Sequence, residues 1–444
     1  MTGTKKKQSV FRLSVPIFIE LFLQMLVGNV DQMMLSQFSQ QSVAAIGNAN
    51  QIMNVVVIAL NVFSAASTIL ITQYIGAENR KKISEVASVS LLCITGISVL
   101  LTAAVTVFAG PVFSAMNLKG QVAAEAAQYL VIVGAGILAQ GLYLNIAAIL
   151  RSFGMVKEVM LASVLMNVIN IGGNAVLIGG LVGFPRLGIA GAAISTDLSK
   201  LIGLLLAVLL LQKRTDVRPG MRWLRPFPTD ALKRLLYIGL PSGGEELSYN
   251  VSQICIMSFI NLFGTAVMTT KVYCSMLANV SYVYCIALSQ ATQIVLGYKI
   301  GEGRRDELTG PVRRSVLISI AVAETITLLL FWQSDAVLGL FTSDPAVLKL
   351  GHSILFIELF LELGRAVNIT MVRSLVAAGD IKTPVTAGLV CMWGVSVLFS
   401  WLFGVVLGWG LAGIWVAMTM DEVIRGAVFL IRWKSGAWRR KSLI

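Results

Sequence analysis

The chain consists of long apolar runs separated by short polar breaks or breaks that contain Gly and Pro. The twelve runs cover about residues 13–38, 49–75, 84–110, 122–150, 158–180, 187–211, 233–263, 273–298, 312–332, 347–373, 384–408 and 410–432. A helix that crosses about 30 Å of hydrocarbon needs about 20 mostly apolar residues, and each run provides them. The pattern therefore predicts an all-α polytopic membrane protein with twelve transmembrane helices.

The composition supports a membrane protein and excludes several other classes. Of the 444 residues, 56% are hydrophobic and 13% are charged, against roughly 25% charged residues in a soluble domain. These values exclude a soluble enzyme, a disordered protein and an ordinary nucleic-acid binder. We expect membrane lipid around the chain and no nucleic acid as a partner, in spite of the net charge of +13.

Lysine and arginine gather in alternate breaks between the apolar runs. With the N-terminus inside, the inner segments hold 28 of the 35 basic residues, and the outer loops hold 4. Such an excess is typical of cytoplasmic loops. It predicts a multi-pass protein of the cell inner (plasma) membrane, with both termini and the polar segment 212–232 in the cytoplasm.

The two halves of the chain repeat one another at a shift of 225 residues. Pro16 corresponds to Pro241, Ile75-Gly76 to Ile300-Gly301, and Lys157 to Lys382. We predict an N-lobe over 1–231, with six helices and the linker 212–231, and a C-lobe of six helices over 232–444. Because six is even, the lobes share one orientation, and the fold is two pseudo-symmetric six-helix bundles. Alternating-access transporters are built from such repeats.

Four oxygen-bearing side chains of the first half are expected at one depth. At about 1.5 Å per helical residue, Asp31 lies about 27 Å from the inner side, and Asn170 and Asn174 about 18 and 24 Å. Thr196 comes at about 25 Å. These side chains are suited to a site for H⁺ or Na⁺. The alternative for the two asparagines is hydrogen bonding between helices.

Two further charges lie beside Thr196 in the same apolar run. Asp197 points about 100° away from Thr196 on a helix. Lys200 follows Asp197 at i+3, a spacing that brings the two side chains together. We therefore consider two roles for Asp197, a second acid for the cation site or a partner of Lys200.

The second half carries its own acids inside apolar runs. Glu358, Glu362 and Arg365 share one helix face, while Glu245 and Glu246 lie together in the first run of that half. Charged groups at this depth are costly and invite a functional interpretation. The alternative is a static Glu–Arg network. Because Arg365 can neutralise one acid, we expect this face to serve substrate binding or packing more than obligatory ion coupling.

Three stretches carry a family resemblance. They are Val30-Asp31-Gln32-Met33-Met34, the segment from Asn170 to Thr196, and Leu375-Val-Ala-Ala-Gly379-Asp380-Ile-Lys382-Thr-Pro384. In this order the chain resembles the multidrug and toxic compound extrusion (MATE) family. The resemblance implies a cation site, with Na⁺ as one candidate ion, at Asp31, Asn170, Asn174 and Thr196. Some members have an acid where this chain has Asn174.

The resemblance also implies the activity. We expect a monomeric antiporter, not an enzyme and without a cofactor, that exports small organic cations such as drugs or toxic metabolites by alternating access, driven by H⁺ or Na⁺. One alternative is a flippase for lipid-linked precursors. An intramembrane enzyme is disfavoured by the single histidine. A major facilitator transporter is disfavoured because Gly76-Ala-Glu-Asn-Arg-Lys-Lys82 lacks the loop motif of that class.

Overall fold

A computed structural model describes residues 9–36, 39–116, 118–180, 183 and 185–444, without the side chains of Asn29, Asp31, Gln32 and Gln40. Throughout this described part, every regular element is a helix. The prediction of an all-α fold is therefore confirmed.

The described chain forms two compact units. The N-unit is Ile19–Gly243, and the C-unit is Met1–Phe18 together with Gly244–Ile444. Helix α1 (Val10–Ser36) and helix α8 (Thr229–Ile260) each contribute to both units. Each helix passes from one unit to the other two residues after an internal proline, Pro16 in α1 and Pro241 in α8. The predicted lobe boundary at 231/232 stays a prediction.

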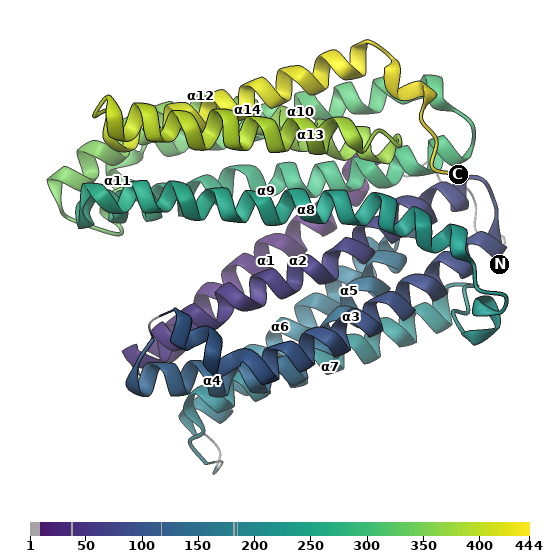
Figure 1. Cartoon of the computed structure of the whole chain (residues 1–444), viewed down its shortest axis with the longest axis horizontal. Helices are drawn as coiled ribbons and strands as arrows, with labels where there is room; N and C mark the ends of the chain where they lie inside the picture. Colours follow the sequence, from purple (N-terminus) through teal and green to yellow (C-terminus); the bar gives the residue numbers. More distant parts are fainter. Residues whose placement is uncertain (1–8, 37–38, 117, 181–182, 184) are drawn as a thin grey trace. The chain divides into compact units, whose positions relative to one another are not determined.

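The other elements run roughly side by side within their unit (Figure 1). The N-unit contains α2 (Gln40–Gly76), α3 (Arg80–Ala115), α4 (Gly120–Ala135), α5 (Ile137–Ser152), α6 (Val156–Gly179), α7 (Gly188–Arg214) and the short η2 (Met221–Leu224). The C-unit contains α9 (Thr265–Gly301), α10 (Thr309–Trp332), α11 (Ser334–Gly339), α12 (Pro345–Ala377), α13 (Lys382–Cys391), α14 (Gly410–Lys434), and the short η3 (Asn261–Phe263), η4 (Arg305–Glu307) and η7 (Ala437–Arg440).

Polar caps fix where several helices begin. The Asn79 side chain accepts a hydrogen bond from the backbone N–H of Lys82 and starts α3. The Asp344 side chain does the same for Ala346 at the start of α12, where Pro345 takes the first helical position. Both patterns satisfy backbone donors that a helix leaves open at its first turn.

The helix boundaries reproduce the repeat read from the sequence. Helices α2 and α9 each have 37 residues, and both ends are shifted by 225 positions. The same shift carries the start of α4 and the end of α5 onto the two ends of α12. The pseudo-symmetry therefore extends to the lengths of individual helices.

The repeat is broken at Gly136. The sequence predicts one continuous helix over 122–150, but α4 and α5 meet there at an angle of 49°. The matching helix α12 runs without interruption. The expected helix over 384–408 also differs, since α13 continues as two π-helical segments, η5 (Met392–Val397) and η6 (Ser400–Val406).

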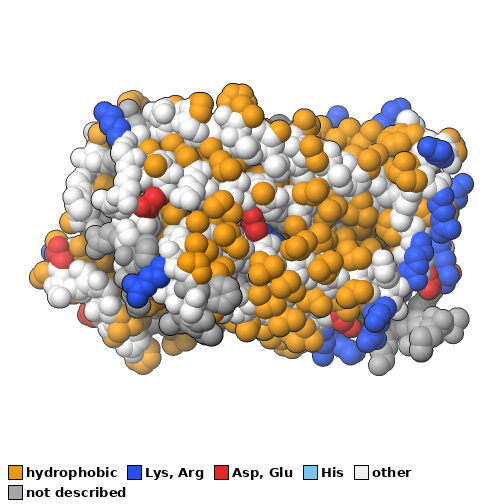
Figure 2. Space-filling view, turned by 90° about the horizontal axis from the view of Figure 1, so that it is seen from below, with side chains coloured by type: hydrophobic (Ala, Val, Ile, Leu, Met, Phe, Trp, Pro, Cys, Tyr) orange, Lys and Arg blue, Asp and Glu red, His pale blue; other side chains and the backbone are white. Residues whose placement is uncertain are grey.

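The described helices account for twelve membrane crossings. Eight are long and apolar enough to cross a membrane, and the bent pair α4–α5 makes nine. Helices α8, α12 and α14 complete the twelve, and they carry the buried acids and arginines. Figure 2 shows a face with a broad apolar field and with Lys and Arg gathered at one end. The twelve-helix prediction is confirmed.

Helix α12 is the centre of the C-unit, where it packs against α9, α10 and α14. One apolar cluster includes Leu361 and Trp415, and another includes Met371 and Phe429. The charged residues of α12 lie between these two clusters along the helix. The fold thus encloses a polar layer between two apolar layers.

Candidate functional site: a polar cavity and a buried ion network

Small residues bring α6 and α7 close together in the N-unit. A Cβ atom at Gly173 would lie 2.4 Å from Ser195 Oγ, and one at Gly191 would lie 2.6 Å from the Leu177 carbonyl oxygen. Side chains larger than hydrogen do not fit at either position. Close approach of this kind lets polar groups of two membrane helices reach each other.

The close packing joins two of the predicted site residues. Asn170 Nδ2 donates a hydrogen bond of 3.3 Å to Thr196 Oγ1. Ser195 Oγ donates to the Asn170 carbonyl oxygen at 2.8 Å. A bond between membrane helices is worth about 1 kcal/mol. The structure therefore brings Asn170 and Thr196 together, while their role in cation binding stays a prediction.

A cavity of about 270 Å³ opens beside this pair. Its polar lining residues are Asn50, Asn54, Tyr129, Gln140, Asn174, Thr196 and Lys200. Its other lining residues are Gly28, Leu35, Val43, Ile46, Met53, Val57, Val133 and Ala192. An apolar wall with a few polar groups is typical of small-molecule sites. We call it the N-unit cavity.

The side chain of the fourth predicted residue, Asp31, lies outside the described residues. Its position in the chain is nevertheless informative. Gly28 and Leu35 line the cavity, and they lie three residues before and four residues after position 31. This spacing puts the three positions on one helix face.

Lys200 and Asp197 do not form the expected ion pair. Neither has a hydrogen bond or ion pair of 4.0 Å or less to another described residue. Asp197 instead packs against the break between α4 and α5, where a Cβ at Gly136 would lie 2.0 Å from Asp197 Oδ1. Lys200 lines the cavity, one turn after Thr196. The i, i+4 spacing of 196 and 200 was the signal for this location.

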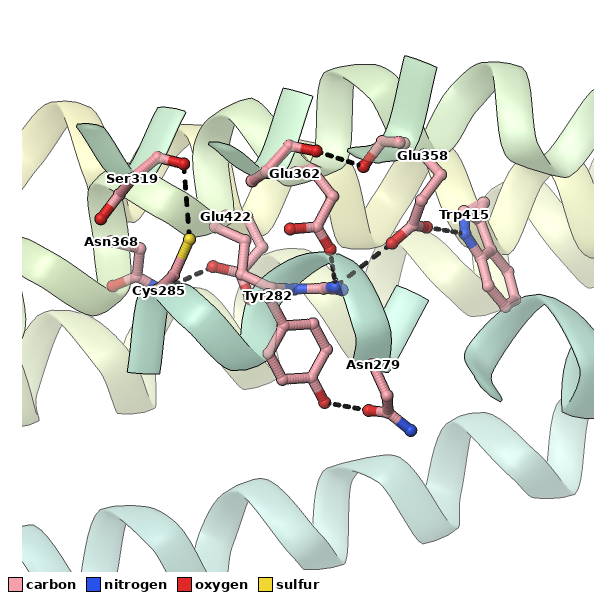
Figure 3. A network of polar contacts seen from close by, with 12 residues as sticks. Asn279, Tyr282, Cys285, Ser319, Glu358, Glu362, Asn368, Trp415 and Glu422 are labelled. Carbon is pink, nitrogen blue, oxygen red and sulfur yellow. Dashed lines mark hydrogen bonds and ion pairs between the residues drawn. The ribbon is translucent and has the colours of Figure 1, made fainter. Parts of the chain in front are cut away.

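The C-unit contains a buried network centred on two arginines (Figure 3). Arg365 donates to Glu358 Oε1 at 3.2 Å and also binds Glu362. Both glutamates are buried. The predicted face of Glu358, Glu362 and Arg365 is therefore an ion-paired cluster.

The second arginine lies on α14. Arg425 donates to Asp421 Oδ2 at 2.6 Å and to Glu422 Oε1 at 3.1 Å. Asn368 of α12 donates to Glu422 Oε2 at 2.6 Å and so joins the two helices. Four carboxyl groups thus share two guanidinium groups. Such networks depend on every partner, because removal of one leaves another charge buried and unpaired.

Residues of other helices complete the network, and sequence reasoning missed them. Trp415 Nε1 donates to Glu358 Oε2 at 2.5 Å. The Arg365 guanidinium lies 4.8 Å from the centre of the Tyr282 ring, and Tyr282 donates to Asn279. These partners are far apart in the sequence, so periodicity gave no signal for them.

Glu245 and Glu246 do not join this network in the described part of the chain. Glu245 packs against α13, where a Cβ at Gly388 would lie 2.4 Å from Glu245 Oε1. Glu246 is exposed. The five C-lobe candidates therefore separate into an ion-paired cluster and two acids of α8.

Comparison with known proteins decides the family. The model of the MatE family matches residues 16–176 and 241–402. This chain belongs to the MatE family. The two matched segments begin 225 residues apart, so one family model covers both repeats of this MatE transporter. The resemblance read from the sequence is confirmed, and the chain is a membrane transporter and not an enzyme.

Relatives cover the chain almost from end to end. The uncharacterized transporter YisQ of Bacillus subtilis is 37% identical over 438 residues, which is 99% of this chain and 96% of YisQ. A probable multidrug resistance protein NorM of Thermotoga maritima is 25% identical over 442 residues, 99% of this chain and 94% of NorM.

Solved structures show the same fold. A MOP superfamily transporter from Pyrococcus furiosus, described as having a binding pocket of reverse polarity, has a TM-score of 0.90 at 21% identity. A multidrug resistance MATE transporter in an outward-facing conformation has a TM-score of 0.90 at 22% identity. Each comparison covers 98% of this chain and 97% of the other.

Proposed function

We propose that this MatE transporter is a cation-coupled antiporter that exports small organic compounds, in the manner expected of a multidrug exporter. The observation that carries the proposal is the N-unit cavity, in which Asn174 and Thr196 lie beside the α1 positions 28 and 35. The cavity combines an apolar wall with amide and hydroxyl groups. The printed description of the Thermotoga relative as a probable multidrug resistance protein supports the same function.

In this proposal Asp31 is the coupling carboxylate, and Asn170, Asn174 and Thr196 supply neutral oxygens around it. The coupling ion is H⁺ or Na⁺. Antiport requires that ion and substrate favour different conformational states. A carboxylate whose charge is cancelled by the ion provides this difference. The ion-paired cluster of Glu358, Glu362 and Arg365 then serves packing or substrate binding, and Glu245 and Glu246 are secondary candidates.

We further propose that the transporter works as a monomer in the cell inner (plasma) membrane, surrounded by lipid and without a cofactor. The family match gives no support to a flippase for lipid-linked precursors.

Asp31→Asn tests the coupling role because the amide keeps the shape of the side chain and removes the titratable charge. We expect folded, inserted protein without gradient-driven efflux. The assay is dye export from proteoliposomes under separately imposed H⁺ and Na⁺ gradients. Asp335→Asn, at an exposed position of α11, is the matched control and should export like the wild type. Wild-type efflux with unchanged pH and Na⁺ dependence in Asp31→Asn would refute the mechanism.

A further inference from the structure

The N-unit cavity has a basic group on its wall. Lys200 is the one charged side chain among its described lining residues, none of which is acidic. The residue is half-buried on α7, one turn after Thr196. A cavity proposed for organic cations therefore has a fixed positive charge on its described wall.

No described residue neutralises this charge at close range. Asp197 is the nearest acid along α7, but it does not line the cavity, and it packs against Gly136 at the break between α4 and α5. Lys200 has no ion pair or hydrogen bond to another described residue. Because an unpaired ammonium away from bulk water is costly, an anionic group that enters the cavity gains a favourable partner.

Other groups of the wall suit a carboxylate bound at Lys200. Asn50 and Asn54 of α2 contribute side-chain amides, whose N–H groups can donate to a carboxylate oxygen. Gln140 Oε1 is buried and has no hydrogen-bond partner among the described residues. This acceptor suits an N–H donor on the same ligand. Met53, Val57 and Val133 provide apolar contact for a ring system.

We propose that Lys200 selects substrates by charge, by binding the carboxylate of organic zwitterions. A substrate then carries both a cationic group and a carboxylate on an apolar body. The inference rests on the proposed export function and narrows its substrate class from organic cations in general to zwitterions with a free carboxyl group.

Binding of two dyes to the purified transporter in lipid nanodiscs, without any gradient, tests the assignment. The probes are a zwitterionic rhodamine with a free carboxyl group and its methyl ester, which share one ring system and differ in the carboxylate. Fluorescence polarisation gives both affinities. We expect the wild type to bind the free acid at least about tenfold more tightly than the ester, as for one charge-assisted contact.

Variants at position 200 identify the group responsible. Lys200→Met keeps the length and apolar stem of the side chain and should abolish the preference, chiefly by weakening binding of the free acid. Lys200→Arg should retain it. Lys271→Met, a loss of lysine on α9, is the matched control and should bind both dyes like the wild type.

Three outcomes would overturn the assignment. They are equal wild-type affinity for acid and ester, an unchanged preference in Lys200→Met, and wild-type binding of neither dye. The first of these needs no variant, so the test holds even where a substitution prevents folding. A wild type that prefers the free acid but exports neither dye under an H⁺ or Na⁺ gradient would contradict the proposed antiport and leave the Lys200 assignment standing.

Discussion

Individual polar residues inside the two units have different surroundings. In the N-unit, Asn170 and Thr196 form a neutral hydrogen bond, and Lys200 stands alone on the cavity wall. In the C-unit, Glu358 and Glu362 are tied to Arg365. A neutral pair can change partners at little cost, whereas a buried ion-paired cluster resists change. This contrast supports placing ion exchange in the N-unit and a packing or substrate-binding role in the Arg365 cluster.

Arg365→Met tests the packing role. The variant leaves Glu358 and Glu362 without their guanidinium, and loss of one partner of a buried pair costs about 3–5 kcal/mol. We expect a clear fall of the melting temperature in nanodiscs, partly restored by adding Glu362→Gln, which removes one unpaired charge.

Arg304→Met is the control for this change, because its partners Glu302 and Glu307 form partly exposed ion pairs worth less than about 1 kcal/mol. Melting curves of all four proteins in one lipid composition give the comparison. The packing assignment fails if Glu362→Gln alone preserves expression and substrate affinity but uncouples transport.

Helices of the two repeats match in length but differ in one bend. Helix α12 is continuous, whereas α4 and α5 are separated at Gly136 and enclose an angle of 49°. The backbone of Gly136 has φ −80°, which any residue adopts, so the glycine is required by a contact and not by its conformation. That contact is the carboxylate of Asp197.

Gly136→Ala should therefore destabilise the N-unit, because the added methyl group overlaps Asp197 Oδ1. Overpacking of this kind costs about 1–3 kcal/mol. Adding Asp197→Ala should relieve most of the loss, giving a non-additive double-mutant cycle of melting temperatures. Gly172→Ala in α6 is the control, since a Cβ there meets no atom within 4 Å. An additive cycle would argue against the contact.

The whole molecule places its basic residues unevenly along the sequence. The bias of 28 inner to 4 outer Lys and Arg predicts that both termini and the segment 212–232 are cytoplasmic. The segment contains the short helix η2, in which the Arg222 guanidinium lies 4.9 Å from the centre of the Trp223 ring.

A single cysteine at position 222 on a cysteine-free background measures the topology. We expect no labelling by an impermeant maleimide in intact cells and full labelling after permeabilisation. A cysteine at position 119, in a predicted outer loop, is the control and should react from outside. Reaction of residue 222 in intact cells would reverse the predicted orientation.

The sequence by itself determined the architecture of this protein. Apolar runs about as long as a bilayer is thick leave few alternatives to membrane helices, because an unpaired backbone group in hydrocarbon is too costly. The shift of 225 residues, visible in Pro16 and Pro241, then determined the twofold organisation. Helical spacing also grouped Glu358, Glu362 and Arg365 on one face.

Only the tertiary structure decided which partners these residues meet. Trp415 reaches Glu358 from a helix 57 residues away, and Asp197 turns from Lys200 to Gly136 because the α4–α5 break leaves room for its carboxylate. Periodicity describes one helix at a time, whereas the choice between neighbours depends on how side chains of several helices fill one space. Lys200 on the cavity wall is therefore a result of packing that helical spacing could suggest but not establish.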